Sequence, residues 1–152
     1  MTVSFPRDGC SRLCRVAASL LCFVTLPLAA CEIDVLPLHF GAINPLHANA
    51  SDSATSLTVT CETSTSYTVT LGEGSASFAD RRMQSAAHTL AYNLYTDASR
   101  NVVWGDGTAG TLTVAGSDDG STATHTIYAR VPAQPQAAPG VYADSIVVTV
   151  SF

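Results

Sequence analysis

Between Cys31 and Phe152 the chain alternates apolar and polar residues in short runs, and this period of two is the strongest constraint on its fold. The clearest run is the last one, YADSIVVTVSF, which places Ile146, Val148 and Val150 on one side of an extended chain. We find no long stretch with the 3.6-residue period of a helix. The sequence therefore predicts an all-β domain.

Glycine, proline and small polar residues interrupt the alternating runs, as is typical of a two-layer sandwich. The first run, 32–40, contains Pro37 and is predicted to lie at a sheet edge or to carry a bulge. We assign 72–83 to a loop and the proline-rich segment 132–139 to a crossover that cannot continue a ladder. The other predicted strands are 54–61, 66–71, 90–95, 101–104, 111–114, 122–131 and 142–152.

The first thirty residues have the composition of a secretory signal peptide. Arg7, Arg12 and Arg15 precede an apolar run, 16–30, that is too short to span a bilayer comfortably and ends in small residues. We therefore expect export, cleavage near Ala30, and two parts: a signal peptide over 1–30 and one domain over 31–152.

The predicted mature domain is acidic. It has four arginines and no lysine against eleven acidic residues, which gives a net charge of −7. Scattered arginines on an acidic chain do not form the basic footprint of a nucleic-acid-binding protein, and an acidic chain is repelled by anionic membranes. We expect no nucleic-acid partner.

Two cysteines, Cys31 and Cys61, remain after the predicted cleavage. A pair of cysteines in an exported chain predicts a disulfide, worth about 3–4 kcal/mol for a loop of roughly thirty residues. LAAC, ending at Cys31, also fits the bacterial lipobox, in which the cysteine is lipidated. Lipidation would leave Cys61 as an odd thiol, so the disulfide is the preferred interpretation.

The candidates for chemistry do not converge on a site. The four histidines, His39, His47, His88 and His125, lack the close spacing of a zinc site, and no serine lies in a Gly-x-Ser-x-Gly elbow. The SDDG segment, 117–120, lacks the further ligands of a calcium loop. We predict no catalytic residue, no metal or cofactor site, no enzyme activity and no small-molecule substrate.

Three side chains leave an alternative open. Trp104 could stack on a sugar ligand, although a core or turn-covering role is favoured. Arg81 and Arg82 could recognise an acidic partner, although closure onto a local acid such as Asp80 or onto loop carbonyls is favoured.

Several segments in series resemble the Spore Coat Protein U domain family, the subunit module of archaic chaperone-usher pili. The segments are CEIDVLPLHFG, LTVTCETSTSYTVTLGEG, RRM, LAYNLYTD, VVWGDGT and GVYADSIVVTVSF. The resemblance covers essentially the whole of 31–152, and the series is much more specific than any single segment.

This resemblance implies an incomplete immunoglobulin-like sandwich with six main strands and the seventh missing. A periplasmic chaperone supplies the missing strand in such subunits, and another pilin subunit replaces it in the fibre at an outer-membrane usher. The residues expected to pair with the chaperone or donor strand are those of the last strand: Tyr142, Ile146, Val148, Val150 and Phe152.

The function predicted from this resemblance is a structural subunit of a fimbria, exported through the periplasm to the cell surface for attachment or biofilm formation. Cleavage at Ala30 would leave no donor segment, so we expect the chain to accept a strand without giving one. The alternative is a self-sufficient, secreted or lipid-anchored β-sandwich that acts as a coat or binding module.

Overall fold

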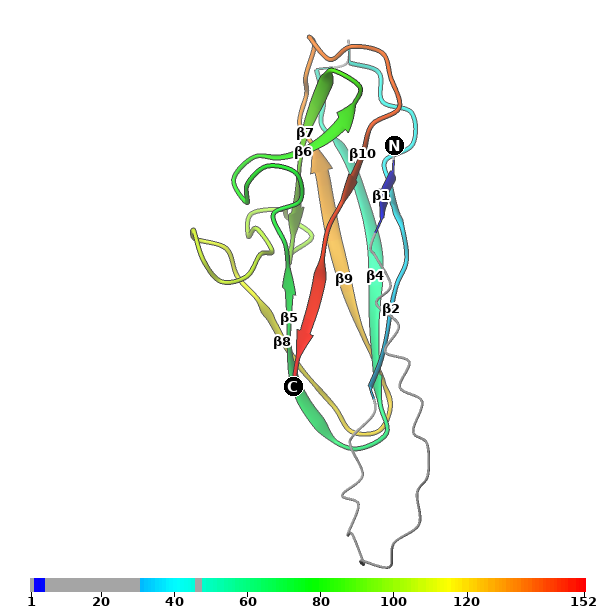
Figure 1. The fold of residues 1–152 in the computed structure, drawn as a ribbon, viewed down its shortest axis with the longest axis vertical. Helices are drawn as coiled ribbons and strands as arrows, with labels where there is room; N and C mark the ends of the chain where they lie inside the picture. Colours follow the sequence, from blue (N-terminus) through cyan, green and yellow to red (C-terminus); the bar gives the residue numbers. More distant parts are fainter. Residues whose placement is uncertain (1, 5–30, 46–47) are drawn as a thin grey trace, which may run out of the picture.

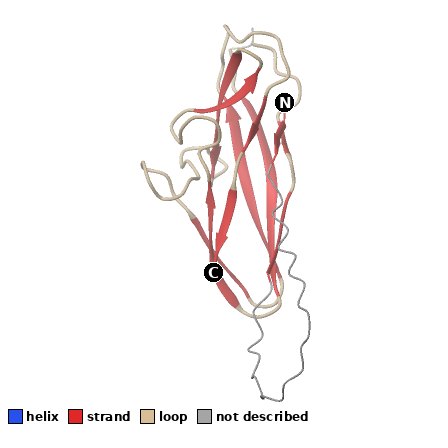
Figure 2. Cartoon of the chain, viewed as in Figure 1, coloured by secondary structure: helices blue, strands red, loops and turns tan. Residues whose placement is uncertain are grey.

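The computed structural model describes residues 2–4, 31–45 and 48–152, and strands are the regular structure found there (Figures 1 and 2). Most of the predicted signal peptide and His47 lie outside the described residues. Within those ranges, no helix is long and apolar enough to cross a membrane. The strands are β1 (Thr2–Ser4), β2 (Cys31–Val35), β3 (Leu38–His39), β4 (Ser51–Cys61), β5 (Thr65–Leu71), β6 (Arg81–Ser85), β7 (His88–Tyr95), β8 (Val114–Asp118), β9 (Thr122–Val131), β10 (Ala143–Ser145) and β11 (Val148–Ser151).

The strands form two sheets, as predicted. The large sheet has the order β2-β4-β9-β7-β6-β10-β1-β3, and the small sheet has the order β11-β5-β8. The stretch that forms β2 and β3 is broken at Leu36 and Pro37, and its two halves lie at opposite ends of the large sheet. The large sheet therefore curls back towards its own first strand, and the small sheet covers part of the interior (Figure 1).

The longest strand pair of the large sheet is β4–β9, with a register from Ser51↔Val131 to Thr60↔Thr122. Inward positions such as Leu57, Val59 and Ile127 are completely buried, while the threonines between them face outward. This is the pattern that the alternating sequence predicts.

The structure corrects three details of the predicted strands. Residues 81–83, the end of the predicted loop 72–83, instead begin β6, where the inward Arg81 and Met83 are both buried. Residues 101–104 form only isolated bridges. The strand predicted at 111–114 instead begins at Val114 and continues to Asp118 through Gly116, a residue that suggests a turn.

Gly116 is required in β8 because an aromatic ring occupies the place of its side chain. A Cβ atom there would lie 2.5 Å from the Cζ atom of Tyr67. The Tyr67 hydroxyl in turn makes a 2.8 Å hydrogen bond with His125 of β9, which links the small sheet to the large one. Burial of the imidazole lowers the pKa of His125.

The predicted disulfide is confirmed: Cys31 of β2 is bonded to Cys61 of β4, its direct partner in the register. The bond joins β2 to the long pair β4–β9, and the two cysteines are separated by 30 residues. It therefore restrains β2 where the rest of that strand has only one sheet neighbour among the described residues.

We expect the double replacement of Cys31 and Cys61 by alanine to lower the free energy of unfolding by about 2–4 kcal/mol, because the unfolded chain gains loop entropy. Urea unfolding under oxidising conditions measures the loss. The same measurement in a reductant should bring the original chain close to the double variant. An unchanged unfolding midpoint in the variant would contradict a stabilising role for this disulfide.

Candidate functional site: the open edge beside the last strand

The last strand passes from the large sheet to the small one. Its first half, β10, lies in the large sheet and its second half, β11, lies in the small sheet, with Ile146 and Val147 between them. The backbone N–H of Gly72 donates a 2.8 Å hydrogen bond to the Val147 carbonyl, which secures this crossing point. Residues 142, 144 and 146 are buried, whereas 143, 145 and 147 are exposed.

The last strand has few backbone partners. β10 is in register with β6 at one residue pair, Ala143↔Gln84, and with the parallel strand β1 on its other side. β11 pairs with β5, and no second neighbour is found for it in the part of the chain that the structure describes. One edge of β11 is therefore open.

β2, the first strand in the order of the large sheet, also has one open edge. β2 pairs with β4, and its other edge has no ladder partner among residues 2–4, 31–45 and 48–152. β1 bridges β10 and β3 over three residues (Figure 1). The space between β10 and β3 thus accepts an extended strand, while β11 and β2 remain without one.

Side-chain burial shows the same opening independently of the hydrogen bonds. On β4, the inward residues Leu57 and Val59 are fully buried, but their partners on β2 are not: Val35 is half-buried, and Ile33 is 40% exposed. Side chains that pair directly in an antiparallel ladder lie on the same face of the sheet. The inward face of β2 therefore lacks the cover that the inward face of β4 has.

The last strand shows the same asymmetry. Val69 and Leu71 of β5 are fully buried, whereas their partners in the register, Val150 and Val148, are only half-buried. Phe152 follows at 63% exposed, with its ring 6.4 Å from that of Tyr67. The apolar side chains of β2 and of β11 are thus each covered by one neighbouring strand only. This is the pattern expected if one strand of a sandwich were absent between them.

The five predicted pairing residues share one face of the last strand but differ in exposure. Tyr142 and Ile146 are already buried in the core, whereas Val148, Val150 and Phe152 flank the opening. Ile33 and Val35, the apolar residues on the opposite flank, were not predicted as pairing residues. The alternation of Cys31, Ile33 and Val35 was a signal that could have found them.

A buried arginine lies behind the last strand. Arg81 has no exposed surface; its guanidinium donates two hydrogen bonds to the Gly72 carbonyl, one to the Trp104 carbonyl and one to Oδ1 of Asn93. Burial lowers the pKa of Arg81, and the nearby Tyr92 and Asp144 oppose this shift. Arg81 thus binds loop carbonyls, and Arg82 pairs with Asp80, as the sequence analysis favoured.

Trp104 is part of the core and does not offer a face to a ligand. Its side chain is 1% exposed, and its indole N–H donates a 3.1 Å hydrogen bond to the Val69 carbonyl of β5. The carbonyl group of Trp104 accepts from Arg81. Trp104 thus lies in the core, which is the role favoured from the sequence.

We expect Trp104→Phe to lower the free energy of unfolding by about 1–3 kcal/mol, because the buried Val69 carbonyl loses its donor and a cavity forms beside it. Leu112→Ala is the control, since Leu112 is largely exposed and should cost less than about 0.5 kcal/mol. Thermal unfolding followed by near-ultraviolet circular dichroism compares the two. Equal stability of the two variants would contradict the core role of the indole.

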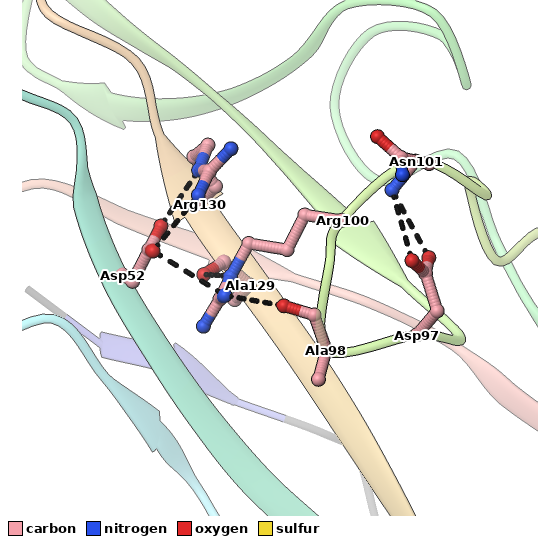
Figure 3. Close-up of polar contacts among 7 residues, drawn as sticks. All are labelled: Asp52, Asp97, Ala98, Arg100, Asn101, Ala129 and Arg130. Atoms are coloured by element: carbon pink, nitrogen blue, oxygen red, sulfur yellow. Dashed lines mark hydrogen bonds and ion pairs between the residues drawn. The ribbon is translucent and has the colours of Figure 1, made fainter.

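The other polar clusters have structural partners. Asp52 receives two hydrogen bonds from Arg130 and an ion pair at 3.3 Å from Arg100 (Figure 3). The bonds from Arg130 hold the pKa of Asp52 below its usual value. Arg100 also donates to the carbonyls of Ala98 and Ala129, so the loop after β7 is held against β9.

The SDDG segment closes a turn. One oxygen of Asp118 accepts from the Gly120 and Ser121 N–H groups, and the other accepts from the Cys61 N–H. No group of three or more His, Cys, Asp or Glu that could hold a metal ion is found among the described residues.

Comparison with known proteins identifies the family of this chain. The sequence model of the Spore Coat Protein U domain matches residues 17–149. The chain belongs to the Spore Coat Protein U domain family. One relative is Protein U of Myxococcus xanthus, which is 31% identical to this chain over 129 residues. The alignment covers 76% of this chain and 71% of Protein U.

A solved structure shares the fold of this Spore Coat Protein U domain. It is the CsuC–CsuE chaperone–tip adhesion subunit pre-assembly complex, from the archaic chaperone-usher Csu pili of Acinetobacter baumannii. The TM-score is 0.60 at 22% identity, over 82% of this chain. The match spans 40% of the length of the solved chain, and at this identity the likeness concerns the fold.

Proposed function

We propose that this chain is a structural subunit of an archaic chaperone-usher fimbria that accepts a strand from another polypeptide. The observation that carries the proposal is the half-covered apolar face on both flanks of one opening, Ile33 and Val35 on β2 and Val148 and Val150 on β11. Strand addition at such an edge supplies both the missing backbone partners and the missing apolar cover.

In the proposed assembly, a periplasmic chaperone occupies the opening first, and a segment of another pilin subunit replaces it at an outer-membrane usher. The subunit then stands on the cell surface, where the fibre serves attachment or biofilm formation. Family membership and the likeness to a subunit of Csu pili support this role. The protein supplies a folded surface and an acceptor edge, without bond-making chemistry.

Hydrogen exchange tests the proposal directly. The exported chain is purified alone and after co-expression with a periplasmic pilus chaperone, and backbone exchange is compared strand by strand. We expect the amides on the free edges of β11 and β2 to exchange rapidly in the lone chain and to be strongly protected in the complex, with β4 and β9 protected in both. Co-expression should also raise the soluble yield.

The alternative of a self-sufficient coat or binding module makes the opposite prediction. If the lone chain is a soluble monomer that unfolds reversibly, and if the edges of β11 and β2 are already protected in it, the strand-acceptor role fails. The disulfide engages the Cys31 thiol that a lipid anchor would require.

A further inference from the structure

A carboxylate lies on the inward face of the last strand, among apolar residues. Asp144 of β10 is 9% exposed, between the fully covered Tyr142 and Ile146. Its Oδ2 atom accepts a 2.7 Å hydrogen bond from the Tyr92 hydroxyl, and its Oδ1 atom accepts from the Ser145 N–H. Burial and the bond to Asp144 raise the pKa of Tyr92, so this hydroxyl remains a donor.

The space around Asp144 is restricted on the side of the 72–74 loop. Gly74 has a φ of +74°, and a Cβ atom there would clash with Oδ2 of Asp144. On the side of the opening, the position opposite Asp144 in the parallel ladder belongs to β1, at Val3. In this structure, β1 is the strand between β10 and β3. A donor strand that replaced β1 would become the neighbour of Asp144 on that side.

Asp144 has accepting capacity that residues 2–4, 31–45 and 48–152 do not use. A carboxylate offers about four lone-pair sites, and within those residues each oxygen of Asp144 accepts one hydrogen bond. Covering such a group with a large apolar side chain leaves the remaining sites without water or a partner, which is costly. A hydroxyl or amide side chain at the same place would donate to it.

Resting on the proposed function, we propose that Asp144 sets the register of the incoming strand by selecting a serine, threonine or asparagine opposite itself. The positions of that strand beside Val148 and Val150 take large apolar side chains, because they complete a purely apolar surface. The inward face of the incoming strand is thus apolar except at the position opposite Asp144, where a polar residue is selected.

Alternation alone cannot define this register. A slip by one residue exposes the apolar side chains, but a slip by two returns them to the interior. A single buried polar pair distinguishes registers two residues apart, as buried polar residues do in other assemblies. Asp144 is the residue of the last strand that can supply this distinction.

A strand appended to the full chain tests the proposal. A segment of alternating valine and threonine is joined after Phe152 through an Asn-Gly turn, which fixes its register along β11 and β10. Its inward residue opposite Asp144 is serine, valine or leucine in three versions; valine is the residue of β1 that is in register with Asp144. The chain is expressed with export, and unfolding in urea is measured on the processed protein.

We expect the serine version to have an unfolding equilibrium constant at least about tenfold smaller than the leucine version, with valine between them. In the control versions, serine is moved to the inward position beside Val148, where it should weaken the fold instead. In a Tyr92→Phe/Asp144→Leu background, which removes both polar partners, leucine should become the preferred residue opposite position 144.

The outcomes separate the two proposals. If the appended strands stabilise the chain, but serine, valine and leucine are equivalent opposite Asp144, the register role is overturned while the acceptor role stands. If no appended strand stabilises the chain, the proposed function fails and the inference with it. The comparison within the original background does not depend on whether the double variant folds.

Discussion

An exported chain that carries the appended alternating strand, with serine opposite Asp144, should unfold with a free energy about 3–6 kcal/mol above that of the unmodified exported chain. Covering four large apolar side chains contributes on the order of 6–12 kcal/mol before costs. The loss of backbone entropy in the added residues opposes this gain, and the new ladder hydrogen bonds to the open edge offset part of that loss. Chemical denaturation followed by tryptophan fluorescence, with Trp104 as the reporter, measures the difference.

The control for this prediction is a strand of the same length in which the inward valines are replaced by threonine. It offers the same backbone hydrogen bonds to β11 and β2 but little apolar cover. We expect it to recover less than half of the stabilisation, because the hydrophobic term dominates the energy of strand addition. A gain of similar size from both strands would show that edge pairing, and not core completion, is the physical basis of acceptance.

The second large effect concerns Arg81. We expect Arg81→Met to lower the free energy of unfolding by about 3–5 kcal/mol, because methionine fills much of the space but donates no hydrogen bond. The carbonyls of Gly72 and Trp104 would lose the Arg81 donor inside the protein, and the side-chain oxygen of Asn93 would keep only the Leu94 N–H. Urea unfolding of the appended-strand chain provides a stable background for this measurement.

Arg82→Met is the matched control, since Arg82 is the next residue of the same strand and faces outward. Its ion pair with Asp80 is well exposed, so we expect a change within about 1 kcal/mol. A large loss for Arg82 and a small loss for Arg81 would reverse the structural assignment of the two arginines. Equal losses would show that the strand propensity of methionine, and not the burial of Arg81, determines the loss of stability.

Much of the fold could be predicted because its signals are local. Alternation identified the long strands β4, β5, β7 and β9, and Pro37 marked the break between β2 and β3. β6 and β8 were missed or misplaced for a physical reason. Arg81 suggests solvent, yet the carbonyls of Gly72 and Trp104 and the side-chain oxygen of Asn93 satisfy it in the interior. Gly116 suggests a turn until the ring of Tyr67 is placed beside it.

The candidate site was predicted on one flank only. The pattern of the last strand indicated Val148, Val150 and Phe152, and the resemblance to pilus subunits implied that the strand lacks a neighbour. It did not indicate Ile33 and Val35, because their exposure depends on which strands are absent beside them. It also gave no sign that Asp144 lies among the apolar residues, since aspartate at that point of a strand usually faces water.

The amino-acid sequence by itself determined the all-β class, the disulfide between Cys31 and Cys61, and the inward and outward faces of the long strands. These follow from side-chain alternation and from the chemistry of a cysteine pair, both of which are properties of the chain before it folds. Only the tertiary structure decided that Arg81 is completely buried and that the edges of β2 and β11 lack cover. The reason is that burial and edge pairing depend on which distant segments lie next to one another.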